Sequence, residues 1–201
     1  MDDKDIYFTI EKTASAEFKD RGSKFIALAF PVQTVDDFKH RLGEVKKEHP
    51  KANHHCFAYR LGLDNYTYRV SDDGEPSGTA GKPILGQIDS RQLTNTLVIV
   101  VRYFGGTLLG VPGLINAYKT VTALVLQVVP VIQKTVELKY SLQFDYTQVN
   151  DVMQIIKQLN CTVHQQEMNL FCRFVIGIPK ARLDEALHRF KDIRDLEMNK
   201  S

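Results

Sequence analysis

Short apolar segments alternate with polar ones along the chain, and their spacing predicts a protein that contains both strands and helices. The most β-branched run is T-L-V-I-V-V-R-Y-F at residues 96–104. A run of this kind predicts a central strand that is buried on both faces. Further strands are predicted at 6–12, at 23–32 and, as a hairpin through L-D-N at 63–65, at 54–62 and 66–71.

Helical spacing of apolar residues predicts three helices in the first two thirds of the chain. The first begins after Thr34 and ends before Pro50. Thr34 is followed three residues later by Asp37, which is a variant of the capping box at a helix start. A short helix is predicted after Pro83, and a mostly buried one over residues 114–129.

Beyond a predicted linker at residues 131–136 the pattern starts again. The predicted order is strand, helix, strand, strand, helix, at 136–146, 148–159, 162–168, 170–178 and 181–193, with a last strand at 195–199. This order is that of the ferredoxin-like, or split βαβ, fold. We therefore predict an α+β protein with two domains, residues 1–132 and 136–201.

Composition and charge narrow the classes of function. With 201 residues, 43% of them hydrophobic and 25% charged, the chain differs from disordered and collagen-like proteins. The 26 basic and 24 acidic side chains give a net charge of +2, so bulk charge does not favour nucleic acid or an anionic membrane. RNA binding would need a local patch. We predict no DNA and no membrane partner, and the patterns favour no particular oligomeric state.

The cysteines and the apolar segments indicate a cytoplasmic protein. Cys56, Cys161 and Cys172 are odd in number and lack C-x-x-C spacing, so we expect core thiols and neither a disulfide framework nor a zinc site. The start M-D-D-K-D-I-Y-F lacks the apolar stretch of a signal peptide. Residues 120–132 are shorter than the roughly 18 apolar residues that a membrane span requires.

A glycine-rich loop follows the central strand. Gly105, Gly106, Gly110 and Gly113 lie between that strand and a predicted helix. Without side chains, backbone N–H groups at a helix start can approach an anion such as phosphate. The alternative is that the glycines only make a tight strand-to-helix connection.

The end of the central strand places a cation beside an aromatic ring. Side chains alternate along a strand, so Arg102 and Phe104 share one face and Tyr103 lies on the other. An arginine next to a ring suits phosphate binding and base stacking. The alternative is that Arg102 pairs with a loop carboxylate such as Asp72 or Asp73.

A second loop, D-D-G-E-P-S-G-T-A-G at residues 72–81, is too rich in turn residues to continue a strand or a helix. Its three carboxylates offer oxygen ligands to a divalent cation, but their spacing fits no EF-hand, and we expect the aspartates to accept backbone N–H groups. Ser77 and Thr79 have no identified base. The adjacent His54 and His55 lack the spacing of metal ligands. We predict no metal and no cofactor.

These two loops carry a resemblance to a known family. S-D-D-G-E-P-S-G-T-A-G-K-P-I-L at 71–85 and V-V-R-Y-F-G-G-T-L-L-G at 100–110 closely resemble the IMPACT/YigZ family. The resemblance extends through H-H-C-F-A-Y-R at 54–60 and G-L-I-N-A-Y at 113–118. It implies an N-terminal β-α-β sandwich like a small-subunit ribosomal protein domain and a domain of elongation factor G, and a ferredoxin-like second domain.

The resemblance also implies a link to translation, because eukaryotic relatives regulate translation by binding a ribosome-associated scaffold protein. Here the family's two motifs fall on Asp72, Asp73, Gly74, Glu75, Pro76, Ser77, Gly78, Thr79 and Gly81, and on Arg102, Tyr103, Phe104, Gly105 and Gly106. The chain departs from the family at Leu108, Pro112 and Asn116, where Lys, Gly and Arg are usual. Arg102, Lys82 and Lys119 remain as cations.

Three hypotheses for function follow. The first is a cytoplasmic, translation-associated binding protein rather than an enzyme, whose two loops converge on RNA, the ribosome or another phosphorylated ligand. Its contacts would come from Arg102, Tyr103, Phe104, Gly105, Gly106, Gly110, Gly113 and Lys82. The second is a metal-dependent phosphoryl-group or nucleotide hydrolase that uses Asp72, Asp73 or Glu75. The third is a regulator that binds a translation-control protein, with loops of purely structural role.

Overall fold

A computed structural model describes residues 5–64 and 66–201. The chain divides into two compact units, the first formed by residues 7–134 and the second by residues 135–201 together with Asp5 and Ile6. Each unit is described by itself. Residues 1–4, part of the acidic start noted above, and Asn65 in the predicted hairpin turn lie outside the described residues.

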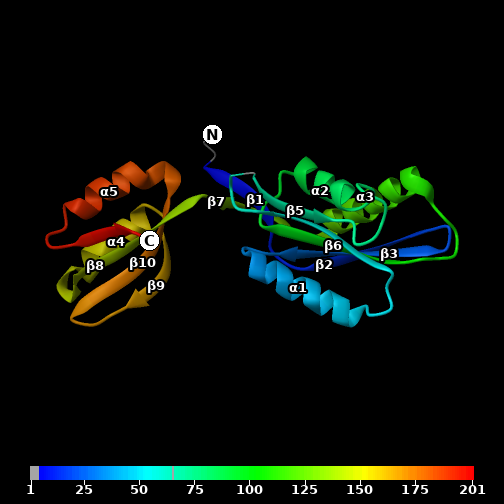
Figure 1. Cartoon of the computed structure of the whole chain (residues 1–201). Coiled ribbons are helices and arrows are strands. Elements are labelled where there is room, and N and C mark those ends of the chain that lie inside the picture. The colour runs from blue at the N-terminus through cyan, green and yellow to red at the C-terminus, as the bar shows by residue number, and fades with distance from the viewer. Residues whose placement is uncertain (1–4, 65) are drawn as a thin grey trace. The chain divides into compact units, whose positions relative to one another are not determined.

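An antiparallel sheet flanked by helices on both faces forms the first unit (Figure 1). Within the described residues its strand order is β2-β3-β6-β4-β5, and all neighbouring strands are antiparallel. Helix α1 covers one face, and helices α2 and α3 cover the other. The bounds are β2 Ala14–Asp20, β3 Ser23–Pro31, α1 Val35–Glu48, β4 His54–Leu61, β5 Thr67–Ser71, α2 Gly81–Ser90, β6 Thr96–Tyr103 and α3 Gly110–Val128.

Burial on both faces explains the continuous apolar run of β6. Val98 and Val100 pack into the core beneath α2 and α3. Leu97, Ile99 and Val101 pack into the core beneath α1. The prediction of a central strand buried on both sides is therefore confirmed, and the face that carries Val98 and Val100 continues toward the glycine loop.

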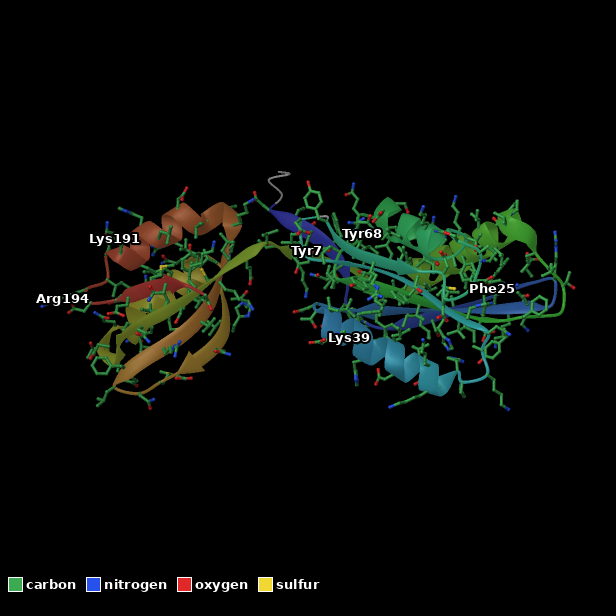
Figure 2. All side chains as sticks on the ribbon, viewed as in Figure 1. Tyr7, Phe25, Lys39, Tyr68, Lys191 and Arg194 are labelled. Carbon is green, nitrogen blue, oxygen red and sulfur yellow. The ribbon has the colours of Figure 1, made fainter. Side chains whose placement is uncertain are left out.

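The first helix begins as its sequence predicts. Thr34 accepts a hydrogen bond from the Asp37 N–H, and the Asp37 carboxylate accepts one from the Thr34 N–H, which together make the capping box. On its exposed side, Lys39 pairs with Asp36 at 3.0 Å and points away from the sheet (Figure 2). Exposed pairs of this kind contribute little to stability, so α1 is held mainly by its apolar face.

Two strands differ from the prediction. Strand β2 was not predicted, because A-S-A-E-F-K-D carries small and polar residues, and it forms as an edge strand by pairing with β3. Residues 131–135, predicted as linker, form strand β7, Val131–Thr135, which pairs with β1, Ile6–Ile10, in a two-stranded sheet. Its side chains are mostly exposed, so backbone pairing rather than burial makes it a strand.

Helices α2 and α3 begin earlier than predicted. Gly81 is the first residue of α2 and Gly110 the first of α3, so Pro83 and Pro112 lie inside first turns. Proline is tolerated there because the N–H groups of a first turn have no partner within the helix. Part of the predicted glycine loop is therefore helical.

The second unit has the ferredoxin-like order predicted from its sequence. Within the described residues its antiparallel sheet runs β11-β8-β10-β9, and α4 and α5 pack on one face through the core that contains Leu142, Phe174 and Phe190. Short 3₁₀ turns precede both helices. The bounds are β8 Glu137–Asp145, α4 Val149–Gln158, β9 Thr162–Glu167, β10 Phe171–Pro179, α5 Leu183–Lys191 and β11 Glu197–Lys200.

The cysteines are core residues in both units. Cys56 and Cys172 are buried, Cys161 is partly buried, and all three are free thiols. Burial, with a smaller contribution from Glu137, raises the pKa of Cys161 to about 11. The described residues contain no helix long and apolar enough to cross a membrane.

Candidate functional site

Asp72 organises the loop between β5 and α2. Its carboxylate accepts hydrogen bonds from the N–H groups of Gly78 at 2.8 Å, Ala80 at 3.0 Å and Gly81 at 2.9 Å. Burial alone would raise the pKa of this carboxyl, but the three N–H groups outweigh it and hold the pKa below its usual range. Asp72 thus caps α2, whose own N-cap residue, Ala80, has no capping side chain.

Replacing Asp72 by alanine is expected to lower the free energy of unfolding of the first unit by about 1–3 kcal/mol, because three N–H groups lose their acceptor. A depressed pKa means that this stabilisation is present above the ordinary aspartate value of 3.8 and is lost as pH falls through the folded-state pKa. Urea denaturation from pH 7 downward should therefore show the difference from the wild type shrinking in acid. Ser77→Ala, an exposed position in the same loop, is the control and should change little.

The remaining loop residues tie the loop to β4. The Asp73 carboxylate accepts a 2.6 Å bond from the His55 N–H, and the Asp73 carbonyl accepts a 2.8 Å bond from His54 Nδ1. The Thr79 hydroxyl donates to the Pro76 carbonyl at 2.7 Å. A Cβ on Gly81 would stand 2.8 Å from the Ser71 nitrogen, so this position needs glycine. The prediction that the aspartates accept backbone N–H groups is confirmed.

In the second loop, Gly105 lies against the backbone of the β2–β3 hairpin. A Cβ there would lie 1.9 Å from the Gly22 carbonyl carbon, and the Gly105 N–H donates to Ser23 Oγ at 3.2 Å. Gly106 and Gly110 have φ angles of +87° and +71°, which favour glycine. The close approach of its backbone to the hairpin is a sufficient reason for glycine at position 105, without any bound anion.

Arg102 is the centre of a buried polar group of side chains. As predicted, its side chain lies on the same face of the sheet as Phe104, and 5% of the residue is exposed. Arg102 Nη1 lies 2.6 Å from Glu75 Oε1, and the Tyr118 hydroxyl donates to the same oxygen at 2.7 Å. The guanidinium carbon lies 5.4 Å from the Phe25 ring centre and 5.6 Å from that of Phe104. The carboxylate partner is therefore Glu75, and neither Asp72 nor Asp73.

Tyr118 and Cys56, which the sequence analysis did not assign to the site, complete this group. The Cys56 thiol has two acceptors, the Asp72 carbonyl at 3.0 Å and the Tyr118 oxygen at 3.3 Å. Burial raises the pKa of both Cys56 and Tyr118 far above neutrality, so both keep their protons and neither is an activated nucleophile. One sequence signal could have identified Tyr118. It is a tyrosine on an otherwise apolar helix face, and a buried tyrosine hydroxyl needs a hydrogen-bond partner.

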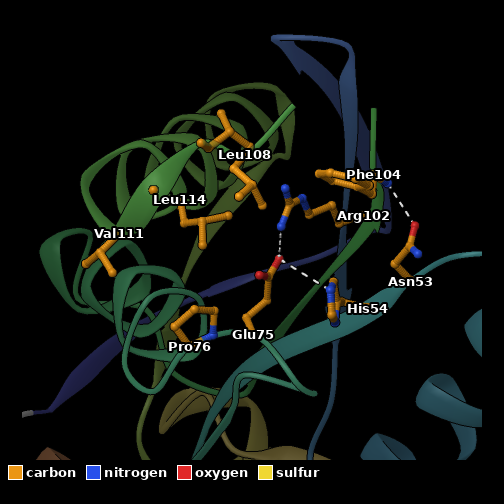
Figure 3. A pocket seen from close by; sticks show the side chains of 11 residues that line it. Asn53, His54, Glu75, Pro76, Arg102, Phe104, Leu108, Val111 and Leu114 are labelled. Carbon is orange, nitrogen blue, oxygen red and sulfur yellow. Dashed lines mark hydrogen bonds and ion pairs between the residues drawn. The ribbon is translucent and has the colours of Figure 1, made fainter. Parts of the chain in front are cut away.

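The two loops meet at one pocket of about 470 Å³, here called the loop pocket (Figure 3). Glu75 and Pro76 come from the first loop, and Arg102 and Phe104 from the end of β6 and the residue after it. The wall is mainly apolar, with Leu108 82% and Val111 52% exposed at its rim. The lining residues are Asn53, His54, Glu75, Pro76, Arg102, Phe104, Leu108, Leu109, Gly110, Val111 and Leu114.

Only some of the predicted site residues line this pocket. Tyr103 lies on the opposite face of the sheet, where its hydroxyl and His49 Nδ1 are 2.9 Å apart. Lys82 is exposed on α2 and is not part of the lining. Gly105, Gly106 and Gly113 are also outside it. The sequence analysis missed Asn53, Leu109, Val111 and Leu114, because ordinary residues on a loop and at a helix start show no pattern that marks a pocket.

Each carboxylate of the first loop has at least one protein partner. Asp72 and Asp73 bind backbone N–H groups, and Glu75 binds Arg102 and Tyr118. Among residues 5–64 and 66–201, no three His, Cys, Asp or Glu side chains are grouped so that they could hold a metal ion. The carboxylates that the hydrolase hypothesis would use thus bind protein groups.

Comparison with known proteins places this site in a family. The Impact N-terminal domain matches residues 21–126, a span that includes both loops and the whole lining of the loop pocket. The chain belongs to the IMPACT family. It is 33% identical to the IMPACT family member YigZ of Escherichia coli over 85% of this chain and 84% of that protein.

Two further matches extend over almost the full length of the chain. Identity to the family member YvyE of Bacillus subtilis is 30%, over 89% of each chain. A crystal structure of a hypothetical protein superposes with a TM-score of 0.76 at 29% identity, covering 98% of both chains. Both matches therefore include the ferredoxin-like second unit as well as the unit that holds the loop pocket.

Proposed function

We propose that this IMPACT family chain is a cytoplasmic, translation-associated regulator that acts by binding a partner protein at the loop pocket. Family membership supports the link to translation, through the role of the eukaryotic relatives described above. The geometry of the loop pocket supports a protein partner. An activated nucleophile or a metal centre would favour an enzyme, and the pocket offers neither among its described residues.

The main support for the proposal is that the buried charges of the pocket are paired with each other, while its exposed edge is apolar. Arg102, the one arginine among the described lining residues, is paired with Glu75 at 2.6 Å, so the charges of these two side chains offset each other. Phosphate backbones are bound mainly by unneutralised cations. Exposed Leu108 and Val111 resemble instead the apolar patches that mark protein interfaces.

RNA or the ribosome is the second candidate, and one observation favours it. Phe104 is 43% exposed and its ring is stacked near the Arg102 guanidinium, an arrangement on which an unpaired base can stack. Binding to RNA would fall steeply with salt and would be lost after nuclease treatment. Binding of an apolar protein segment would survive both, so a pull-down under the two conditions separates the candidates.

Val111→Asp should abolish the regulatory role while leaving the fold intact, because it places a charge on the exposed apolar rim. The measurement is the rate of protein synthesis in cells that lack the endogenous protein and express each variant. Val35→Asp is the matched control, since Val35 is an exposed valine on α1 and outside the pocket. If Val111→Asp restores synthesis control as well as the wild type does, the pocket is not the functional site.

A further inference from the structure

The floor of the loop pocket has an under-used donor. Arg102 Nε is buried and has no hydrogen-bond partner among the described residues, and Nη2 makes only a long 3.4 Å contact to Ser23 Oγ. The arginine side chain is 94% buried by protein, with 6% of it exposed, so water does not fully replace the missing bonds. Buried donors without partners are rare, and each one calls for an explanation such as strain, a bound water or ion, or a functional role.

Beside this donor lies an under-used acceptor. In the described part of the chain, the bonds from Arg102 and Tyr118 and the 3.9 Å contact from His54 Nε2 all end on Glu75 Oε1. The other oxygen, Oε2, receives none of them, and Figure 3 shows it on the side of Glu75 away from Arg102. Glu75 therefore keeps one oxygen that takes part in none of these three contacts and can accept a hydrogen bond from a ligand.

This pair selects an uncharged ligand group. An anion drawn to Arg102 would be repelled by Glu75, and a cation drawn to Glu75 would be repelled by Arg102. A peptide group satisfies both, because its carbonyl accepts from the guanidinium and its N–H donates to the carboxylate. The floor of the pocket thus complements main chain rather than phosphate or a charged side chain.

The apolar residues that line the pocket indicate which kind of side chain would accompany that peptide group. Phe104, Leu108, Val111 and Leu114 surround the space above the floor with carbon atoms. A volume of about 470 Å³ lies within the range of about 300–1,000 Å³ that is usual for ligand pockets. A large aliphatic or aromatic side chain would bury apolar surface here without leaving a polar group unpaired.

We propose that the loop pocket binds an uncharged peptide segment of the partner protein through one large apolar side chain and the peptide group beside it. This inference rests on the proposed function and names the chemistry of the partner. The apolar side chain would fill the space between Phe104, Val111 and Leu114, while the peptide group would bridge Arg102 and Glu75.

The test is an NMR titration of the full-length ¹⁵N-labelled chain with capped amino acids. N-acetyl-leucine and N-acetyl-phenylalanine N-methylamide should shift the backbone signals of Gly110, Val111 and Leu114 and the Nε–H signal of Arg102. We expect dissociation constants of about 1–10 mM, as is usual for fragments of this size. N-acetyl-lysine N-methylamide should bind about tenfold more weakly, and Val111→Asp should remove the shifts.

Three results would overturn the inference. They are the absence of shifts up to the solubility limit of the capped leucine and phenylalanine, equal binding of the lysine compound, and stronger shifts with inorganic phosphate or guanosine monophosphate. The two proposals fail separately. If the capped compounds do not bind but Val111→Asp still abolishes control of protein synthesis, the peptide chemistry is wrong and the function stands. If they bind and Val111→Asp remains fully active in cells, the proposed function is wrong.

Discussion

Replacement of Glu75 by alanine is expected to lower the free energy of unfolding of the first unit by about 3–5 kcal/mol. Removing one partner of a buried ion pair leaves the other charge without compensation, and that is the usual cost. Here Arg102 is 5% exposed and loses its 2.6 Å contact with Glu75, while the Tyr118 hydroxyl loses its acceptor.

The measurement is urea denaturation with one readout for each unit. The chain has no tryptophan, so NMR amide signals are better suited than fluorescence. Folded-state signals from β3, β6 and α3 should disappear at a lower urea concentration than in the wild type. The urea midpoint of the second unit should be unchanged. The double variant Glu75→Leu with Arg102→Met is the control. It also removes the acceptor of the Tyr118 hydroxyl but leaves no unpaired charge, so it should cost less than Glu75→Ala. A Glu75→Ala protein as stable as the wild type would mean that the pair is not buried as described.

Gly105→Ala is expected to destabilise the first unit by about 2–4 kcal/mol, comparable to severe overpacking. The added Cβ would lie 1.9 Å from the Gly22 carbonyl carbon and 2.2 Å from the Ser23 nitrogen. These atoms are backbone and cannot rotate away, so the glycine loop and the β2–β3 hairpin would have to separate. The Gly105 N–H bond to Ser23 Oγ would be lost as well.

Two other glycines provide controls measured in the same denaturation experiment. Gly86 in α2 has nothing within 4 Å of a Cβ, so Gly86→Ala should stabilise the unit by about 0.5–1 kcal/mol. Gly106 also has open space but a φ of +87°, so Gly106→Ala should cost about 1 kcal/mol through backbone strain alone. Equal effects of the alanines at Gly105 and Gly106 would show that the close approach to Gly22 is absent.

The sequence pattern predicted those elements whose residues by themselves indicate the structure they form. The β-branched run of β6, the capping box of α1 and the ferredoxin-like order of the second unit were all predictable. Strands β2 and β7 were not, because each is a strand by virtue of the neighbour with which its backbone pairs. The alternating core-facing residues of β2 are small except for Phe18, so its pattern is weak, and β7 shows no apolar alternation.

The candidate site was predictable in part for the same reason. Alternation correctly placed Arg102 and Phe104 on one face of the sheet. It did not choose among Asp72, Asp73 and Glu75 as the partner of Arg102, because the choice depends on how the first loop folds over β4.

The character of the pocket depends on this choice. A guanidinium without a partner would attract phosphate, whereas one paired with Glu75 leaves a neutral floor under apolar walls. Family resemblance identified both motifs, and only the three-dimensional arrangement shows that Leu108, Val111 and Leu114 stand above them.

The most direct test of this account is a crystal structure of the full-length chain grown with N-acetyl-leucine N-methylamide. We predict the leucine side chain between Phe104, Val111 and Leu114, its carbonyl near the Arg102 guanidinium, and the bond between Arg102 and Glu75 intact. An empty loop pocket, or an anion from the crystallisation solution bound to Arg102 with Glu75 displaced, would contradict it.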